Sequence, residues 1–181
     1  MTALPNLSIL APCDPLEVFG AVEACVNSDG PVYLRLGKAG EPNLTENATE
    51  PFIFGKIRKI ADGCDVAVIG YGPILHLAFQ AAEQLAGPNG VRPAIFSAHT
   101  LKPLDEARVR SLLKEYRKVV VLEECTGFGS LGSRIKTIAW DLKADCRICL
   151  LHLQDKFIKC YGTKTSFCLH MASMWSALRT P

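Results

Sequence analysis

Residues 6 to 36 follow the pattern of a strand, a helix and a second strand, and this pattern restricts the fold more than any other feature. Asn6 to Leu10 is a short apolar run, after which Asp14-Pro15 supplies a helix N-cap and a proline at the first helical position. Apolar residues then recur at three- and four-residue spacing until Asn27 to Gly30 interrupts them, before the apolar run Val32 to Leu36. Two strands joined by a helix in this way lie parallel in one sheet. Such a unit exposes strand edges and an apolar helix face unless other elements cover them.

The chain after residue 36 begins with a different kind of sequence. Residues 37 to 50 are polar, rich in turn formers and without a periodic apolar face, which predicts a linker between domains. Beyond the linker, strand-like and helix-like segments alternate. The expected strands are 52–60, 65–69, 93–97, 119–122 and 146–153, with helices opening at Gly70-Tyr71-Gly72-Pro73 and covering 105–116 and 131–142.

Alternation of this kind favours a largely parallel sheet covered by helices. The tight turn Ala61-Asp62-Gly63 predicts that strands 52–60 and 65–69 are antiparallel neighbours. We therefore expect an α/β fold. It is a three-layer open sandwich with a mostly parallel five-stranded sheet, one strand of which is antiparallel, and a partial βαβ unit precedes it.

Composition describes a folded protein and gives no argument for nucleic acid or a membrane surface as a partner. The 181 residues carry 20 basic and 18 acidic side chains, a formal net charge of +2, and 49% are hydrophobic. No apolar run approaches the roughly 20 residues that a bilayer span requires, and the N-terminus does not read as a signal peptide. We expect a cytoplasmic protein. Its eight cysteines are scattered through apolar segments, which predicts reduced, mostly buried thiols.

Several segments occur in an order that is informative as a set. In chain order, these segments are residues 6–38, His99 to Asp105, Val121 to Glu124, and Gly127 to Ser133. The first segment resembles the last strand-helix-strand unit of the pyrimidine-binding domain of transketolase-like, thiamine diphosphate-dependent enzymes. The other three resemble the transketolase C-terminal domain. The likeness covers about residues 4 to 165, and it also fits 1-deoxyxylulose-5-phosphate synthase and the beta subunits of 2-oxo acid dehydrogenases.

The resemblance implies four regions and an incomplete enzyme. The regions are a terminal βαβ fragment of a pyrimidine-binding domain (1–36), a linker (37–50), a transketolase C-terminal-like domain (51–165) and a tail (166–181). The family's cofactor-activating glutamate lies upstream of any matching segment, and the sequence has no Gly-Asp-Gly motif for magnesium diphosphate. We therefore expect that this chain alone binds no cofactor, and that thiamine diphosphate and magnesium belong to the complete enzyme.

The function implied is that of a C-terminal section or small subunit of a transferase that moves a two-carbon ketol unit between sugar phosphates. Its expected partners are further copies of itself or a chain that carries the cofactor-binding domains. One alternative is a non-catalytic interaction module that keeps the fold without the chemistry. Another is a fragment of a 2-oxo acid dehydrogenase beta subunit, although Arg35 and Lys38 after Gly30-Pro31 favour the sugar-phosphate branch.

Lys38 is the one predicted substrate-binding residue. It stands where transketolases and deoxyxylulose phosphate synthases place an arginine that grips the sugar phosphate, and lysine keeps the charge without the bidentate fork. The alternative is that Lys38 is only the first solvated residue of the linker. Arg35 is expected to be structural or to lie at a contact between subunits.

The other residues that could carry chemistry are expected to have structural roles. Glu123 and Glu124 are expected at an interface, the glycine-rich segment from Gly127 to Gly132 in a structural loop, and Cys125 as an inert thiol. Cys146 and Cys149 fall in one predicted strand, where their side chains point to opposite faces and cannot share a metal ion. No catalytic residue and no metal or cofactor ligand is predicted on this chain.

Overall fold

The computed structural model describes residues 1–85, 92–155 and 157 of the chain. The expected tail 166–181 lies outside the described residues. Within the described part, no helix combines the length and apolar character that crossing a membrane demands. The cytoplasmic location stays a prediction.

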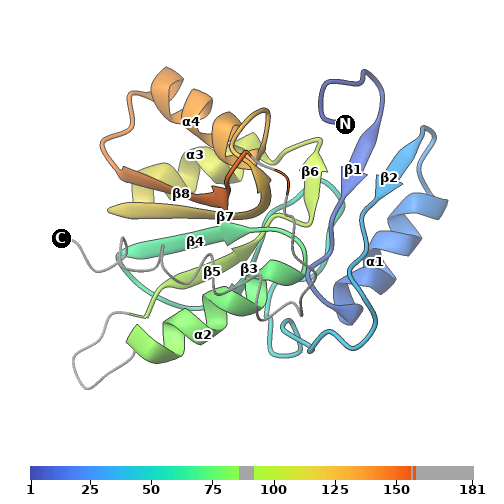
Figure 1. Cartoon of the computed structure of the whole chain (residues 1–181), viewed down its shortest axis with the longest axis horizontal. Coiled ribbons are helices and arrows are strands. Elements are labelled where there is room, and N and C mark those ends of the chain that lie inside the picture. Colours follow the sequence, from blue (N-terminus) through green and yellow to red (C-terminus); the bar gives the residue numbers. More distant parts are fainter. Residues whose placement is uncertain (86–91, 156, 158–181) are drawn as a thin grey trace.

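A five-stranded sheet forms the centre of the molecule (Figure 1). Its strand order is β3-β5-β4-β7-β8, and all neighbouring pairs are parallel except β3 with β5. The strands are β3 (Arg58–Ala61), β4 (Val66–Gly70), β5 (Ala94–Ser97), β7 (Lys118–Thr126) and β8 (Arg147–Leu153). The predicted fold class, with one antiparallel strand in a mostly parallel sheet, is confirmed.

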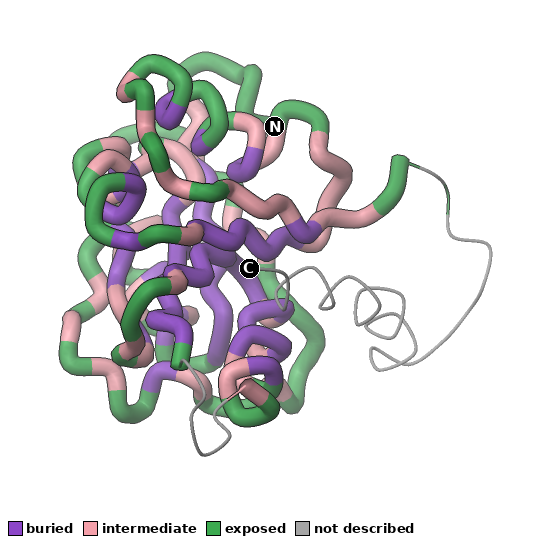
Figure 2. Tube along the Cα trace, turned by 90° about the vertical axis from the view of Figure 1, so that its left-hand side faces the viewer, coloured by how far each residue is buried: buried purple, intermediate pink, exposed green. Residues whose placement is uncertain are grey.

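Helices cover both faces of this sheet and make three layers (Figure 1). Below it in this view lies α2 (His76–Leu85), which follows the short 3-10 helix η1 (Pro73–Leu75), while α3 (Glu106–Glu115) and α4 (Leu131–Leu142) lie above. Side chains alternate accordingly along β4, since Val68 packs on the α2 face and Ile69 on the α3 and α4 face. The residues that Figure 2 colours as buried lie mainly along these central strands.

The N-terminal unit forms a second, smaller sheet beside the first. Strands β1 (Ser8–Leu10) and β2 (Val32–Leu34) are parallel and joined by α1 (Pro15–Val26), as the sequence predicts. The third strand, β6 (Thr100–Lys102), comes from the other part of the chain and pairs antiparallel with β1. The sheet order is β2-β1-β6, so β1 is the central strand.

The structure corrects two sequence-based expectations. Strands β3 and β4 are not hairpin neighbours, because β5 lies between them and pairs with both. The β3–β4 connection passes over the start of β5, because a Cβ on Gly63 would lie 2.2 Å from the backbone of Pro93 and Ala94. The strand expected over 52–60 is also shorter, since Lys56 N–H bonds Ile53 O in a turn before it. Strand β6 was not predicted, because three residues carry too little periodicity to mark a strand.

A buried carboxylate joins the two sheets. Glu17 of α1 accepts hydrogen bonds from Cys13 N (2.9 Å) and from Ser97 Oγ on β5 (2.9 Å), and Arg58 Nη1 of β3 lies 3.7 Å from its Oε1. Glu17 is fully buried and Arg58 nearly so. Burial raises the pKa of the Glu17 carboxyl, although these donors and Arg58 act in the opposite direction.

A neighbouring carboxylate fixes the start of α1 and the segment from 37 to 50. Asp14 is the N-cap of α1, and its Oδ1 accepts from Glu17 N at 2.8 Å. Its Oδ2 accepts from Thr45 N (2.7 Å) and from Thr45 Oγ1 (2.8 Å). The segment predicted as a linker is therefore tied to the helix by a buried side chain. The domain boundaries themselves stay a prediction.

The raised pKa of Glu17 predicts how stability changes with pH. Above the ordinary value of 4.5, the unfolded chain releases this proton while the buried carboxyl still holds it, so rising pH lowers the stability of the wild type. Glu17→Gln does not titrate. Its free energy of unfolding should therefore rise relative to that of the wild type as pH increases from about 4 towards 7.

Urea denaturation of both proteins across that pH range measures the difference. Glu23→Gln, at an exposed position of the same helix, is the matched control and should show no such trend. If the free energy of unfolding of the wild type instead rises relative to that of the variant as pH increases, the attraction of Arg58 outweighs burial. The raised pKa of Glu17 would then be wrong.

Candidate functional site

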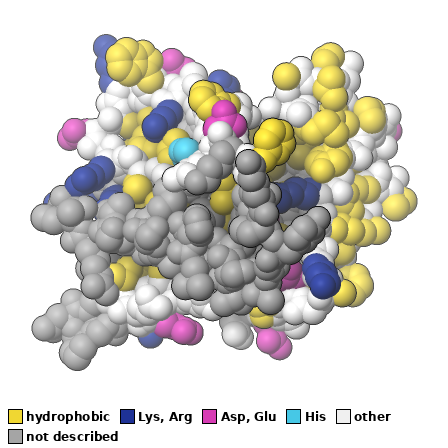
Figure 3. Space-filling view, viewed as in Figure 1, with side chains coloured by type: hydrophobic (Ala, Val, Ile, Leu, Met, Phe, Trp, Pro, Cys, Tyr) yellow, Lys and Arg dark blue, Asp and Glu magenta, His cyan; other side chains and the backbone are white. Residues whose placement is uncertain are grey.

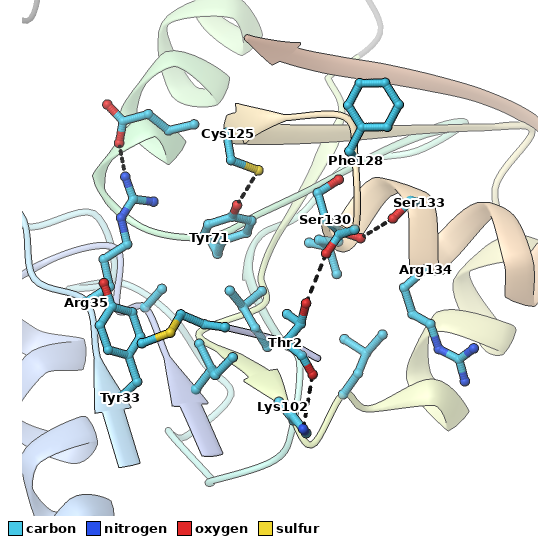
Figure 4. Close-up of a pocket in the computed structure, with 18 of the residues that line it drawn as sticks. Thr2, Tyr33, Arg35, Tyr71, Lys102, Cys125, Phe128, Ser130, Ser133 and Arg134 are labelled. Atoms are coloured by element: carbon cyan, nitrogen blue, oxygen red, sulfur yellow. Dashed lines mark hydrogen bonds and ion pairs between the residues drawn. The ribbon is translucent and has the colours of Figure 1, made fainter. Parts of the chain in front are cut away.

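A cleft of about 810 Å³ lies between the two sheets (Figure 4). It is lined by residues at or just beyond the carboxyl ends of two parallel pairs of strands, one in each sheet: Ala11 after β1, Arg35 after β2, Tyr71 after β4 and Cys125 near the end of β7. Ligands of α/β proteins usually bind at the carboxyl ends of the strands, and pockets of this size hold small molecules. This cleft is therefore the first candidate site.

An ion pair links the two sheets across the cleft. Arg35 Nη2 lies 2.9 Å from Glu124 Oε2, and the two residues are 89 positions apart in the chain. Both side chains are about one third exposed, at 35% and 29%, so the pair is partly screened by water. Glu124 thus contacts the N-terminal unit. Arg35 thus makes an ion pair within this chain.

Cys125 lies deep in the cleft and contacts Tyr71. The Tyr71 hydroxyl is 3.1 Å from Cys125 Sγ, and Sγ lies 3.5 Å from Glu123 Oε2 (Figure 4 draws the first contact). Burial raises the pKa of the Cys125 thiol, and the nearby Glu123 carboxylate acts in the same direction. A thiol with a raised pKa is a poor nucleophile. The local electrostatics therefore favour an inert Cys125.

The glycine-rich segment leads into α4, and a side chain already occupies the position that an anion would take there. Glu123 Oε1 accepts from Ser130 Oγ at 2.8 Å and from Gly132 N at 3.3 Å, at the first turn of the helix. Helix N-termini attract negative charge through their free N–H groups. Glu123 is fully buried, and burial raises the pKa of its carboxyl. It serves as an internal cap for α4.

Lys38 lies outside this cleft. It is exposed in the segment after β2, next to Gly37, and it is not among the residues that line the cavity. A Cβ on Gly37 would meet Pro73 Cγ at 2.5 Å, so this loop packs closely against the start of η1. Of these two cationic residues, which are three positions apart, Arg35 lines the cleft and Lys38 does not.

Cys146 and Cys149 contact opposite faces of the sheet, as their spacing predicts. Cys146 packs with the core on the α3 and α4 side, and Cys149 with the core on the α2 side. Across the described part of the chain, no group of three or more His, Cys, Asp or Glu side chains is arranged to hold a metal ion.

His99 is a residue whose setting the sequence did not reveal. It is fully buried, its ring stacks on Phe52 with centroids 3.9 Å apart, and Nδ1 lies 3.0 Å from Thr100 Oγ1. Burial, assisted by the charge of Arg58, lowers its pKa to about 3, so the ring is neutral at physiological pH. Its backbone carbonyl accepts from Ala11 N at 2.7 Å. His99 therefore belongs to the junction between the sheets.

The outward face of α1 is a second candidate, as a contact surface. We call Leu16, Phe19, Val22 and Val26 the α1 face. Phe19 and Val26 are 76% and 78% exposed, whereas Glu17 on the same helix is fully buried. A surface helix normally shows the reverse arrangement. Figure 3 shows hydrophobic side chains gathered over the region of α1 and β2, and within the described residues β2 pairs with β1 alone.

Comparison with known proteins places these features in a family. The family model "Transketolase, C-terminal domain" matches residues 55–161. A transketolase-family protein of Sinorhizobium fredii is 38% identical over 133 residues, which are 73% of this chain and 38% of that protein. A subunit of the apulose-4-phosphate transketolase of Phocaeicola vulgatus is 30% identical over 133 residues, covering 74% of this chain and 42% of the relative.

A solved structure gives the same fold. The structure described as "Split gene transketolase, inactive beta4 tetramer" superposes with a TM-score of 0.80 at 23% sequence identity, over 94% of this chain and 54% of that one. The chain thus spans about two fifths of the length of the two curated relatives, at 38% and 42%.

The internal cap of α4 predicts that Gly132→Ala destabilises the protein. The added Cβ would lie 2.7 Å from Glu123 Oε1 and 2.9 Å from Leu150 Cδ2, so the carboxylate must leave its hydrogen bonds. We expect a loss of about 1–3 kcal/mol in the free energy of unfolding, despite the better helix propensity of alanine.

Chemical denaturation measures this loss. Gly30→Ala is the control, because a Cβ there meets its nearest neighbour at 3.6 Å. Equal stability of Gly132→Ala and the wild type would show that the carboxylate is not needed at this position.

Proposed function

Because this chain belongs to the transketolase family through its C-terminal domain, we propose that it works in a transferase that moves a two-carbon ketol unit between sugar phosphates. In this proposal the chain is active only together with domains that carry the thiamine diphosphate site. Those domains hold the cofactor and magnesium, which supply the chemistry that breaks and forms the carbon–carbon bond. The present chain completes the assembly and contributes to substrate binding.

The burial pattern of α1 carries this proposal. Eight of the twelve residues of α1, PLEVFGAVEACV, are Ala, Val, Leu, Phe or Cys, and the helix hides its Glu17 while presenting the α1 face to solvent. A helix that presents an apolar face to solvent is typical of one that packs against a further structure. Parallel sheets likewise occur with both faces covered, yet β1 and β2 have α1 as their one joining helix. A second α/β domain packed here would satisfy both requirements.

Two comparisons support an assembly with other chains. One relative is named as a subunit of a transketolase, and the similar solved structure is described as a tetramer of a split-gene enzyme. The sequence also lacks the Gly-Asp-Gly motif that holds magnesium diphosphate in this family. We therefore assign the cofactor to the other domains.

A second candidate function is that of an assembly module without catalytic chemistry. The ionisable side chains deepest between the sheets, Glu17, Arg58 and His99, are all buried and joined to structural contacts. This arrangement favours a scaffold. The two functions differ in whether the assembled complex turns over a sugar phosphate.

The first test mixes this chain with the companion protein from the same genome that matches the remaining part of these relatives. We expect neither protein alone to transfer a ketol unit and the mixture to do so, with thiamine diphosphate and magnesium present. Phe19→Glu on the α1 face should abolish both complex formation and turnover, because a charge would be buried at the contact.

Trp140→Glu is the matched control, since Trp140 is 84% exposed on α4 and lies away from the α1 face. Gel filtration detects the complex, and a coupled assay detects transfer. A complex that forms without turnover favours the assembly module. A Phe19→Glu variant that assembles normally contradicts the assigned contact surface.

Lys38 is proposed to bind the substrate phosphate in the assembled enzyme. Its exposed ammonium is available to a phosphate brought by a partner domain. Lys38→Ala should raise the Michaelis constant for phosphorylated sugars roughly ten- to a hundredfold through the loss of one charge-assisted contact, and Lys38→Arg should preserve binding.

Steady-state kinetics with phosphorylated and unphosphorylated substrates measure this effect. An equal effect on both substrates would indicate a role in docking, not in phosphate binding. Unchanged kinetics would make Lys38 a solvated linker residue.

A further inference from the structure

We propose that the cleft between the two sheets binds a small organic anion with an apolar or aromatic body. This site is separate from Lys38 and does not depend on the proposed function. Four strands direct their carboxyl ends at the cleft, and its volume of about 810 Å³ lies within the range of small-molecule sites.

The cleft has an apolar floor and aromatic walls. Ile9, Leu101 and Leu131 contribute aliphatic surface from β1, β6 and α4. Phe128 is 80% exposed at the rim, as Figure 4 shows, so its ring is free to pack on a ligand. Apolar walls with a few polar groups are the usual composition of a small-molecule pocket.

The charged groups of the cleft favour an anion. Arg35, Lys102 and Arg134 line it together with two carboxylates, Glu106 and Glu124, which leaves an excess of one positive charge. Lys102 Nζ donates to the backbone carbonyls of Thr2 and Leu4 and so holds the N-terminal residues at the edge of the cleft.

Arg35 and Arg134 each have N–H groups beyond those of the nitrogen that forms their ion pair. Arg35 contacts Glu124, and Arg134 contacts Glu106, each through Nη2. A guanidinium carries five N–H donors in a planar fork, so one ion pair at Nη2 leaves other N–H groups for a carboxylate or phosphate. Arg134 is half exposed, lies on the first turn of α4 and is one of the residues that line the cleft.

The ligand anion is assigned to Arg134 and not to the helix N-terminus itself. Glu123 already accepts from Gly132 N and Ser130 Oγ at that terminus. Ser133 and Thr137 lie on the same side of α4 as Arg134 and line the cleft. Their hydroxyls already donate to the backbone carbonyls of Ser130 and Ser133, so Arg134 is the cationic donor that this side of the cleft offers.

Titration of the wild-type chain with two anionic probes and one neutral probe tests the proposal. The probes are phenyl phosphate, 3-phenylpropanoate and 3-phenylpropanamide, followed by amide chemical shifts in nuclear magnetic resonance. We expect dissociation constants on the order of millimolar for the anions, as their size permits, with shifts at residues 128–137. The neutral amide should bind at least several-fold more weakly.

Variants assign the contacts. Arg134→Gln should weaken both anions roughly tenfold through loss of a charge-assisted bond, and Phe128→Ala should weaken all three probes. Lys136→Gln, an equal loss of charge at an exposed position of α4 outside the cleft, should leave binding unchanged. A preference for phenyl phosphate over the carboxylate would identify a phosphate-bearing ligand, and the reverse a carboxylic acid.

Three results would overturn the proposal. They are no cleft shifts with either anion, equal binding of the neutral amide, or equal loss of binding in Arg134→Gln and Lys136→Gln. The experiment uses neither cofactor nor companion protein, so its failure and the failure of the proposed function remain distinguishable.

Discussion

The arrangement of the two sheets depends on the hydrogen bonds of the buried Glu17 side chain. It accepts from the backbone of Cys13 and from Ser97 of the central sheet, with Arg58 beside it. A buried carboxyl group without hydrogen-bond partners in this position would cost on the order of a few kcal/mol, so the contacts are required once Glu17 is buried. Because Glu17 is on α1, they also fix the helix and the strands on either side of it. The cleft exists because this junction holds the small sheet at the carboxyl edge of the large one.

Local sequence patterns predicted the elements whose causes are local. Leu131–Leu142 was expected as a helix and is one, and Asp14 caps α1 as expected. The pairing of β3 with β5 was not predictable from the turn between β3 and β4. The neighbour of a strand is decided by contacts with residues distant in the sequence, and a local turn pattern does not contain them. Strand β6 forms by pairing with β1, so its cause is a contact with a distant segment and not a pattern within its own three residues.

The candidate site was harder to predict for the same reason. The contact of Arg35 with Glu124 joins residues 89 positions apart, and a hydrophobic pattern along the sequence cannot predict such a distant pair. Glu17 reads in sequence as an ordinary first-turn carboxylate, and its burial follows from packing that the sequence pattern does not contain. The opposite faces of Cys146 and Cys149 were predictable, since strand geometry alone decides them.

The carboxylate at the start of α4 has a consequence for ligand competition. Glu123 is attached to the same chain as the N–H group it binds, so its effective concentration at the helix start is far above that of a free phosphate in solution. A dissolved anion must displace a competitor that cannot diffuse away. The N–H group of Gly132 is therefore less accessible to a dissolved phosphate than an uncapped helix N-terminus would be.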